Sequence, residues 1–160
     1  MSRILGVDLG SRRIGLACSD RTGTIATPLK VLERSGSPDQ DDQAIVRVAI
    51  AEEVECIVVG LPLSLSGRDG PAASAVRSEA EALRRVAGRI AGPTMTVELH
   101  DERLTTVTAE RSLLESGMRR DQRRKIRDAV AAAVILQSYL DRPPAQPADQ
   151  AGDPAGEPRP

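Results

Sequence analysis

Apolar residues in the first third of the chain fall into short segments separated by turn-forming residues. One apolar run occupies 4–7, and two further segments at 13–19 and 24–31 are rich in β-branched and apolar residues. A turn signal at 20–23 separates the second segment from the third. Short segments bounded by Gly, Asp and Ser favour strands. We therefore predict three strands joined by tight turns, in an antiparallel meander.

Helical and strand-like patterns alternate in the rest of the chain. Ser37 before Pro38, with Gln40 following, is typical of the start of a helix, whereas the unbroken apolar run at 56–60 predicts a strand that is covered on both faces. The predicted helices are 38–54, Pro71 to about Gly92, Thr105 or Thr106 to Leu114, and 129–140, and the further strands are 56–60 and 95–99. This order predicts an α/β fold with a five-stranded mixed sheet, antiparallel in its first three strands and parallel afterwards, flanked by helices.

The composition predicts one folded domain followed by a tail. With 160 residues, of which 40% are hydrophobic, the chain can build one substantial core. The segment 141–160 contains six of the eleven prolines together with Ala, Gln, Asp and Gly. Such a composition buries too little apolar area to offset the entropy lost on ordering. We expect a domain at 1–140 and a disordered proline-rich tail at 141–160.

Neither a membrane segment nor a disulfide framework is indicated by the sequence. No apolar run reaches the roughly 18 residues of a membrane span, and the start of the chain lacks the pattern of a secretory signal. We therefore expect a cytoplasmic protein. Cys18 and Cys56 lie far apart in strand-like runs without metal-site spacing, so buried thiols are favoured, and a disulfide within or between chains stays open.

Three carboxylates stand at the ends of predicted elements. Asp8 follows the first apolar run, Glu102 follows the strand-like segment 94–100, and Asp128 precedes the alanine-rich helix. Each has a plain structural explanation: turn chemistry, a solvated loop, and a helix cap or dipole partner, respectively. An uncompensated carboxylate on a packed helix face is costly, however. Together the three acids indicate a divalent-metal site for Mg²⁺ or Mn²⁺.

Basic residues form the second candidate constellation. The formal net charge is −1, so contact with a polyanion depends on local clusters. A basic cluster at 119–127 directly precedes Asp128. The chain has no Phe or Trp, and Tyr139 is its only Tyr. Base stacking is therefore a poor binding mode, and contact with phosphates is favoured. The predicted nucleic-acid-binding residues are Arg12, Arg13, Arg103, Arg119, Arg120, Arg123, Arg124 and Lys125.

Four linked motifs resemble the YqgF family, also called RuvX, of Holliday-junction-resolvase-like proteins. The matching segments are 6–17, 59–63, 101–105 and 128–137, in the family's order. The resemblance implies a ribonuclease H-like fold and a nuclease whose acidic metal ligands match Asp8, Glu102 and Asp128. Members are associated with processing the 5′ end of precursor 16S ribosomal RNA, and some are described as junction resolvases.

Several functions stay open at this level. Resolution of a four-way DNA junction requires two symmetric cuts and would predict a homodimer. A catalytically silent RNA-binding assembly factor would use the basic segment alone. A nucleotide-binding fragment related to actin and sugar kinases also opens with an Asp before a Gly-Ser turn, but those proteins need a second related domain. His100 lacks a second His or a nearby Cys and is a weak candidate for catalysis or metal binding.

Overall fold

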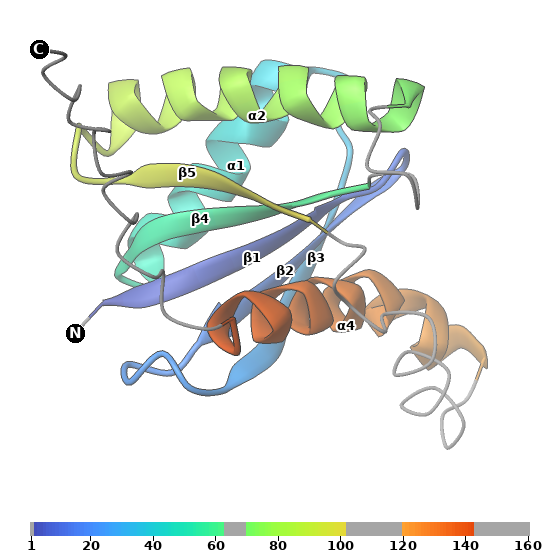
Figure 1. Cartoon of the computed structure of the whole chain (residues 1–160). Coiled ribbons are helices and arrows are strands. Elements are labelled where there is room, and N and C mark those ends of the chain that lie inside the picture. The colour runs from blue at the N-terminus through green and yellow to red at the C-terminus, as the bar shows by residue number, and fades with distance from the viewer. Residues whose placement is uncertain (1, 63–69, 102–119, 143–160) are drawn as a thin grey trace, which may run out of the picture.

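Strands and helices alternate much as the sequence predicts (Figure 1). The computed structural model describes residues 2–62, 70–101 and 120–142, and of 120–126 the backbone alone. The strands are β1 (Arg3–Leu9), β2 (Arg13–Ser19), β3 (Ala26–Glu33), β4 (Val54–Leu61) and β5 (Thr96–Asp101), and the helices are α1 (Pro38–Ala51), α2 (Pro71–Ile90) and α4 (Arg120–Leu140).

All five strands belong to one mixed sheet in the order β3-β2-β1-β4-β5. The strand β2 is antiparallel to both β1 and β3, whereas β4 is parallel to both β1 and β5. The predicted α/β class and five-stranded mixed sheet are therefore confirmed. Because β1, β4 and β5 run in one direction, their carboxyl ends lie at the same edge of the sheet.

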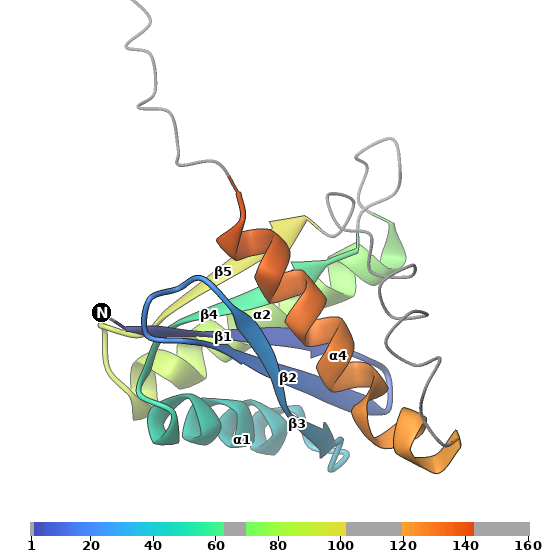
Figure 2. The same ribbon diagram turned by 90° about the horizontal axis from the view of Figure 1, so that it is seen from below.

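Helices cover both faces of the sheet. The helices α1 and α2 lie on one face, and α4 crosses the other over β1, β2 and β3 (Figures 1 and 2). Successive side chains of β1 point to opposite faces of the sheet. Leu5 and Val7 belong to the core under α1 and α2, whereas Ile4 packs on the core under α4. Alternate residues of β1 therefore face different helical layers.

The final helix begins earlier than predicted. The expected start was residue 129, but α4 runs from Arg120 and includes much of the basic segment. Arg, Lys and Gln are good helix formers, although their polar side chains give no apolar periodicity to read. Asp128 consequently lies more than two turns inside the helix. The interpretation of Asp128 as an N-terminal cap or dipole partner is therefore wrong.

The third strand begins later than predicted, because the preceding turn is longer than its sequence signal. One carboxylate oxygen of Asp20 accepts hydrogen bonds from the backbone N–H groups of Thr24 at 2.7 Å and Ile25 at 3.1 Å. These bonds hold residues 24 and 25 in the turn, so β3 starts at Ala26. The N–H of Ala26 instead donates to the side-chain oxygen of Gln137 on α4, at 2.9 Å.

The first helix matches its predicted start and ends early. Ser37 is the N-cap, and its hydroxyl accepts a hydrogen bond from the Gln40 backbone N–H. The helix ends at Ala51, before the predicted residue 54, and Glu53 has a φ of 58° that turns the chain into β4.

The remaining structural predictions fall largely outside the described residues. These are the helix from Thr105 or Thr106 to Leu114 and the tail beyond residue 142. Within the described residues, no helix is long and apolar enough to cross a membrane. Both cysteines are free thiols there: Cys18 is buried, Cys56 is half-buried, and burial raises the pKa of each.

Candidate active site

Asp8 lies near the carboxyl end of β1, on the sheet face that α4 covers. In the antiparallel register Asp8 is paired with Gly15 of β2, and paired residues point to the same face. Gly6, two positions before Asp8, also faces α4, since a Cβ placed there would lie 2.7 Å from Cβ of Leu136. Alternation along β1 therefore directs Asp8 toward the α4 layer.

Asp128 reaches the same place through close packing of its own backbone. A Cβ on Gly15 would lie 1.8 Å from the carbonyl oxygen of Asp128, so the helix rests directly on this glycine. Because Gly15 is the register partner of Asp8, the helix turn that carries Asp128 lies over the strand pair that carries Asp8. The structure thus brings two of the three predicted carboxylates to one end of one sheet face.

An ion pair further fixes Asp128. The Nε of Arg13, at the start of β2, lies 3.1 Å from a carboxylate oxygen of Asp128. The side chains are 39% and 21% exposed, so the pair is partly shielded from water. Arg13 was predicted to bind nucleic acid, and that prediction stays untested. In the structure Arg13 contacts Asp128, the candidate metal ligand. The position of Arg13 in the sequence did not reveal this partner.

Glu102, the third predicted acid, lies outside the described residues. The strand β5 ends at Asp101, which is paired with Leu61 at the carboxyl end of β4. This is the edge of the sheet near which Asp8 lies. In the part of the chain that the structure describes, no group of three or more His, Cys, Asp or Glu side chains could hold a metal ion. The site as described therefore consists of two carboxylates.

Comparison with a family model identifies the chain. A model described as RuvX: Holliday junction resolvase matches residues 2–142. The chain belongs to the RuvX family. This family contains nucleases, and the prediction of an enzyme that hydrolyses phosphodiester bonds is confirmed at that level.

Relatives found by sequence are similar to this chain over most of their length. A protein of Mycobacterium sp. (strain KMS) is 45% identical over 140 residues, which cover 88% of this chain and 80% of the relative. A protein of Myxococcus xanthus (strain DK1622) is 44% identical over 144 residues, covering 89% and 91%. Both are named as candidate pre-16S rRNA nucleases.

Solved structures confirm the fold. Thermus thermophilus RuvC in complex with a Holliday junction substrate superposes with a TM-score of 0.52 at 20% identity, covering 87% of this chain and 94% of RuvC. The yeast mitochondrial Holliday junction resolvase Ydc2 gives a TM-score of 0.51 at 12% identity, covering 87% and 78%. The predicted ribonuclease H-like fold of this RuvX protein is therefore confirmed.

The predicted nucleic-acid-binding residues fall mainly at the start of α4 and in the segment before it. Arg103 and Arg119 lie outside the described residues, and of Arg120, Arg123, Arg124 and Lys125 only the helical backbone is described. This part of α4 extends from Asp128 by roughly 12 Å at the rise of an α-helix. Arg12 is exposed in the turn between β1 and β2.

His100 has a packing role in this RuvX protein. Its Nε2 forms a hydrogen bond of 3.0 Å with the hydroxyl of Ser138, and its ring meets Tyr139 edge to face. Burial lowers the pKa of His100, which favours the neutral ring at physiological pH. The Tyr139 hydroxyl donates to the carboxylate of Glu98, and burial raises the pKa of Tyr139. These contacts join β5 to α4.

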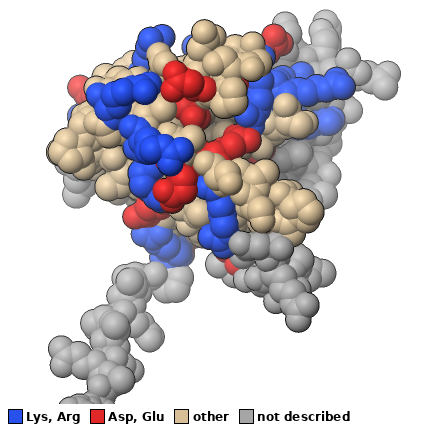
Figure 3. Space-filling model, turned by 90° about the horizontal axis from the view of Figure 1, so that it is seen from above, with Lys and Arg blue, Asp and Glu red and all other residues tan. Residues whose placement is uncertain are grey.

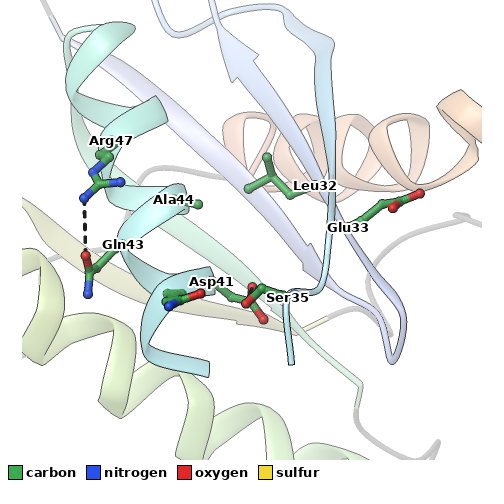
Figure 4. A pocket seen from close by; sticks show the side chains of 8 residues that line it. Leu32, Glu33, Ser35, Asp41, Gln43, Ala44 and Arg47 are labelled. Atoms are coloured by element: carbon green, nitrogen blue, oxygen red, sulfur yellow. Dashed lines mark hydrogen bonds between the residues drawn. The ribbon is translucent and has the colours of Figure 1, made fainter. Parts of the chain in front are cut away.

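A pocket beside α1 is lined by polar side chains that bond to one another. The pocket has a volume of about 440 Å³ and lies between α1 and the end of β3 (Figure 4). Asp41 accepts hydrogen bonds from the backbone N–H and the hydroxyl of Ser35, at 2.9 and 2.8 Å. Arg47 donates to Gln43 on the preceding turn of the helix. The two bonds to Ser35 stabilise the connection from β3 into α1.

Asp42 is a buried acid that the sequence patterns did not single out. It is 7% exposed, and burial, followed by repulsion from Glu79, Asp39 and Asp41, raises its pKa to about 6. Asp42 follows the two acids of the first turn of α1, Asp39 and Asp41, and nothing in the local sequence distinguishes it from them. Only the packing of α2 against α1 shows that Asp42 is enclosed.

We expect Asp42→Asn to change the pH dependence of stability. The folded pKa lies above the ordinary value of 3.8, so the stabilising contribution of the protonated acid is complete below about pH 4 and is lost as pH rises through 6. The variant should therefore gain about 2 kcal/mol over wild type between pH 4 and pH 7. Urea unfolding across this range measures the gain. The exposed Glu55→Gln is the control, and a constant difference for Asp42→Asn would contradict the prediction.

Proposed function

We propose that this RuvX protein is a metal-dependent nuclease in which Asp8, Glu102 and Asp128 hold Mg²⁺ or Mn²⁺. The observation that supports this most is the pairing of Asp8 with Gly15, on which the Asp128 turn of α4 rests. Carboxylate oxygens are the donors that these hard cations prefer, so the two placed side chains fit such an ion. When bound, the metal would activate water and stabilise the leaving oxygen at phosphorus.

The protein's own residues would supply orientation and charge. Asp8 is held by the β1–β2 ladder, and Asp128 by a packed helix and by Arg13. We propose Glu102, the residue after β5, as the third ligand, on its match to the family motif. Arg13 then acts as the counter-ion that orients the Asp128 carboxylate, while the exposed part of the Arg13 side chain stays available to a phosphate oxygen.

Nucleic acid would approach from the side of α4. Figure 3 shows that basic and acidic side chains intermingle on the opposite face of the molecule, over α2. Two arginines of α2 are paired with acids there, Arg84 with Glu81 and Arg89 with Asp39. The basic first turns of α4 are instead continuous with the helix turn that carries Asp128. We therefore propose this end of α4 as the nucleic-acid interface.

We expect Arg123→Ala with Arg124→Ala to flatten the salt dependence of nucleic-acid binding. Two lost phosphate contacts should reduce the slope of log binding constant against log salt by about 2. Fluorescence anisotropy with a labelled four-way DNA junction and with a precursor 16S rRNA fragment measures this slope. Arg47→Ala, on α1 across the sheet, should keep the wild-type slope. An unchanged slope in the double variant would remove the proposed role of α4.

The substrate we propose is the 5′ end of precursor 16S rRNA in ribosome biogenesis. The names of the relatives at 42–45% identity support this choice. A second candidate is a four-way DNA junction, favoured by the description of the matching family model. That activity would need two symmetric active sites and therefore a two-fold homodimer.

One comparison separates the two substrates. The purified protein is incubated with precursor 16S rRNA and with a synthetic four-way DNA junction at equal Mg²⁺ and salt concentrations. Cleavage of the RNA that Asp8→Asn abolishes supports the ribosomal function, and paired symmetric cuts in the junction support the resolvase. Cleavage that persists equally in wild type and Asp8→Asn would come from a contaminant and would leave a non-catalytic binding protein.

A further inference from the structure

Arg34 connects three parts of the molecule at the point where β3 ends. Its Nε donates a hydrogen bond of 2.7 Å to the carbonyl oxygen of Gly10, in the turn between β1 and β2. Its Nη2 donates to both carboxylate oxygens of Glu79 on α2, at 2.9 and 3.3 Å. The Arg34 side chain is 19% exposed, so these bonds are largely shielded from water. The backbone N–H of Arg34 also bonds to the carbonyl of Arg12, at 3.0 Å.

The turn that Arg34 holds is the one that begins at Asp8. The N–H of Gly10 donates to the carbonyl of Asp8 at 3.2 Å, so the two residues are coupled through the backbone. The turn is also tight, because a Cβ on Gly10 would lie 2.5 Å from the carbonyl oxygen of Arg13. A shift of the Gly10 carbonyl would therefore be transmitted to Asp8 on one side and to Arg13 on the other.

The geometry points to Arg34 as a positioning residue that fixes the Asp8 turn against α2, an inference that rests on the proposed metal-dependent nuclease function. Asp128 is held from one side of the sheet, by α4 and Arg13. Arg34 holds the Asp8 turn from the other side, through Glu79 of α2. The two carboxylates are thus anchored to separate layers, and their spacing depends on both anchors.

An arginine suits this role better than a lysine. The planar guanidinium presents separate N–H donors to the Gly10 carbonyl and to the Glu79 carboxylate at once. A lysine is a single compact charge that can keep the ion pair but loses the fixed fork. Loss of partners that orient metal ligands typically costs about 10- to 100-fold in metal affinity or activity. Because Arg34 acts through the backbone, we expect the lower end of that range.

The test compares Arg34→Gln and Arg34→Lys with a matched control in the full chain. Arg3→Gln breaks another ion pair between sheet and helix, that of Arg3 with Glu52 at 3.1 Å, at the opposite end of β1. Three measurements are made: hydrogen exchange of the backbone amides at 9–12, the Mn²⁺ dependence of the thermal midpoint, and kcat with KM on the polymer that wild type cleaves. Arg34→Lys preserves the positive charge. It therefore still tests the inference if Arg34→Gln fails to fold.

We expect Arg34→Gln to exchange the turn amides about tenfold faster, to need about tenfold more Mn²⁺ for an equal midpoint shift, and to lower kcat about tenfold with KM within about twofold. Arg34→Lys should lie between this variant and wild type, and Arg3→Gln should match wild type in exchange and kcat. Unchanged turn exchange would overturn the inference. A raised KM with unchanged kcat would also overturn it and make Arg34 a phosphate-binding residue.

Failure of the nuclease proposal remains distinguishable. If wild type cleaves neither polymer but Arg34→Gln still weakens the Mn²⁺ response and loosens the turn, the positioning role stands and the nuclease proposal fails. If wild type cleaves and Arg34→Gln cleaves equally fast, the nuclease proposal stands and the positioning role fails.

Discussion

Asp8→Asn should reduce the rate of phosphodiester cleavage about a thousandfold while leaving the fold intact. The amide has nearly the shape of the carboxylate but lacks its negative charge, so it holds a divalent cation weakly. A metal ion contributes several kcal/mol of transition-state stabilisation, and about 4 kcal/mol corresponds to about a thousandfold in rate. Single-turnover cleavage at saturating Mg²⁺ measures the loss.

Two further measurements identify the cause of that loss. Millimolar Mn²⁺ should raise the thermal midpoint of wild type and much less that of Asp8→Asn, because only an ion that binds the folded state stabilises it. Glu55→Gln, an exposed acid at the opposite end of β4, should behave as wild type in both assays. Equal stabilisation of wild type and Asp8→Asn by Mn²⁺ would refute the assignment of Asp8 as a metal ligand.

Gly15→Ala is expected to destabilise the protein strongly and to abolish cleavage as a second consequence. The added Cβ would lie 1.8 Å from the carbonyl oxygen of Asp128 and 2.9 Å from the backbone nitrogen of Ala129. These are backbone atoms, which cannot move aside as a side chain can, so α4 must lift from β2. Overpacking of this kind costs about 3 kcal/mol. Chemical denaturation measures that cost, and the cleavage assay measures the displacement of Asp128 from Asp8.

Gly88→Ala is a control that separates the steric clash at Gly15 from the general effect of replacing glycine with alanine. Gly88 lies within α2, and a Cβ there would meet no atom within 4 Å. Gly88→Ala should therefore be neutral or stabilising by up to about 1 kcal/mol, because alanine favours the helix. Equal stability of Gly15→Ala and wild type would mean that α4 does not rest on Gly15, and the proposed juxtaposition of Asp8 and Asp128 would lose its basis.

Local patterns were sufficient for most of the fold. The run at 56–60 became β4, and the apolar stripe after Pro71 became α2, because both are set by residues close in sequence. The start of β3 was predicted too early because side chains of the turn and of α4 accept hydrogen bonds from the backbone there. The carboxylate of Asp20 captured the amides of Thr24 and Ile25, which delayed β3. The pattern of hydrophobic residues does not show that these amides bond to side chains and not to a neighbouring strand.

The candidate site was predicted only in part. Asp8 and Asp128 were selected by their positions, and the structure brings them to one face through the Gly15 contact. Glu102 lies outside the described residues and stays a prediction. Arg34 and Asp42 were missed, since Arg34 directly follows an ordinary strand and Asp42 lies in the second turn of an ordinary helix.

The sequence by itself determined the kinds of elements, their order and the acids placed at their ends. These features depend on propensity and periodicity, which act over a few residues. Only the tertiary structure decided which groups meet: Arg13 with Asp128, Arg34 with Gly10 and Glu79, and α4 with the glycines of β1 and β2. The physical reason is that such contacts join residues tens of positions apart, whose approach is set by strand register and helix packing rather than by any local pattern.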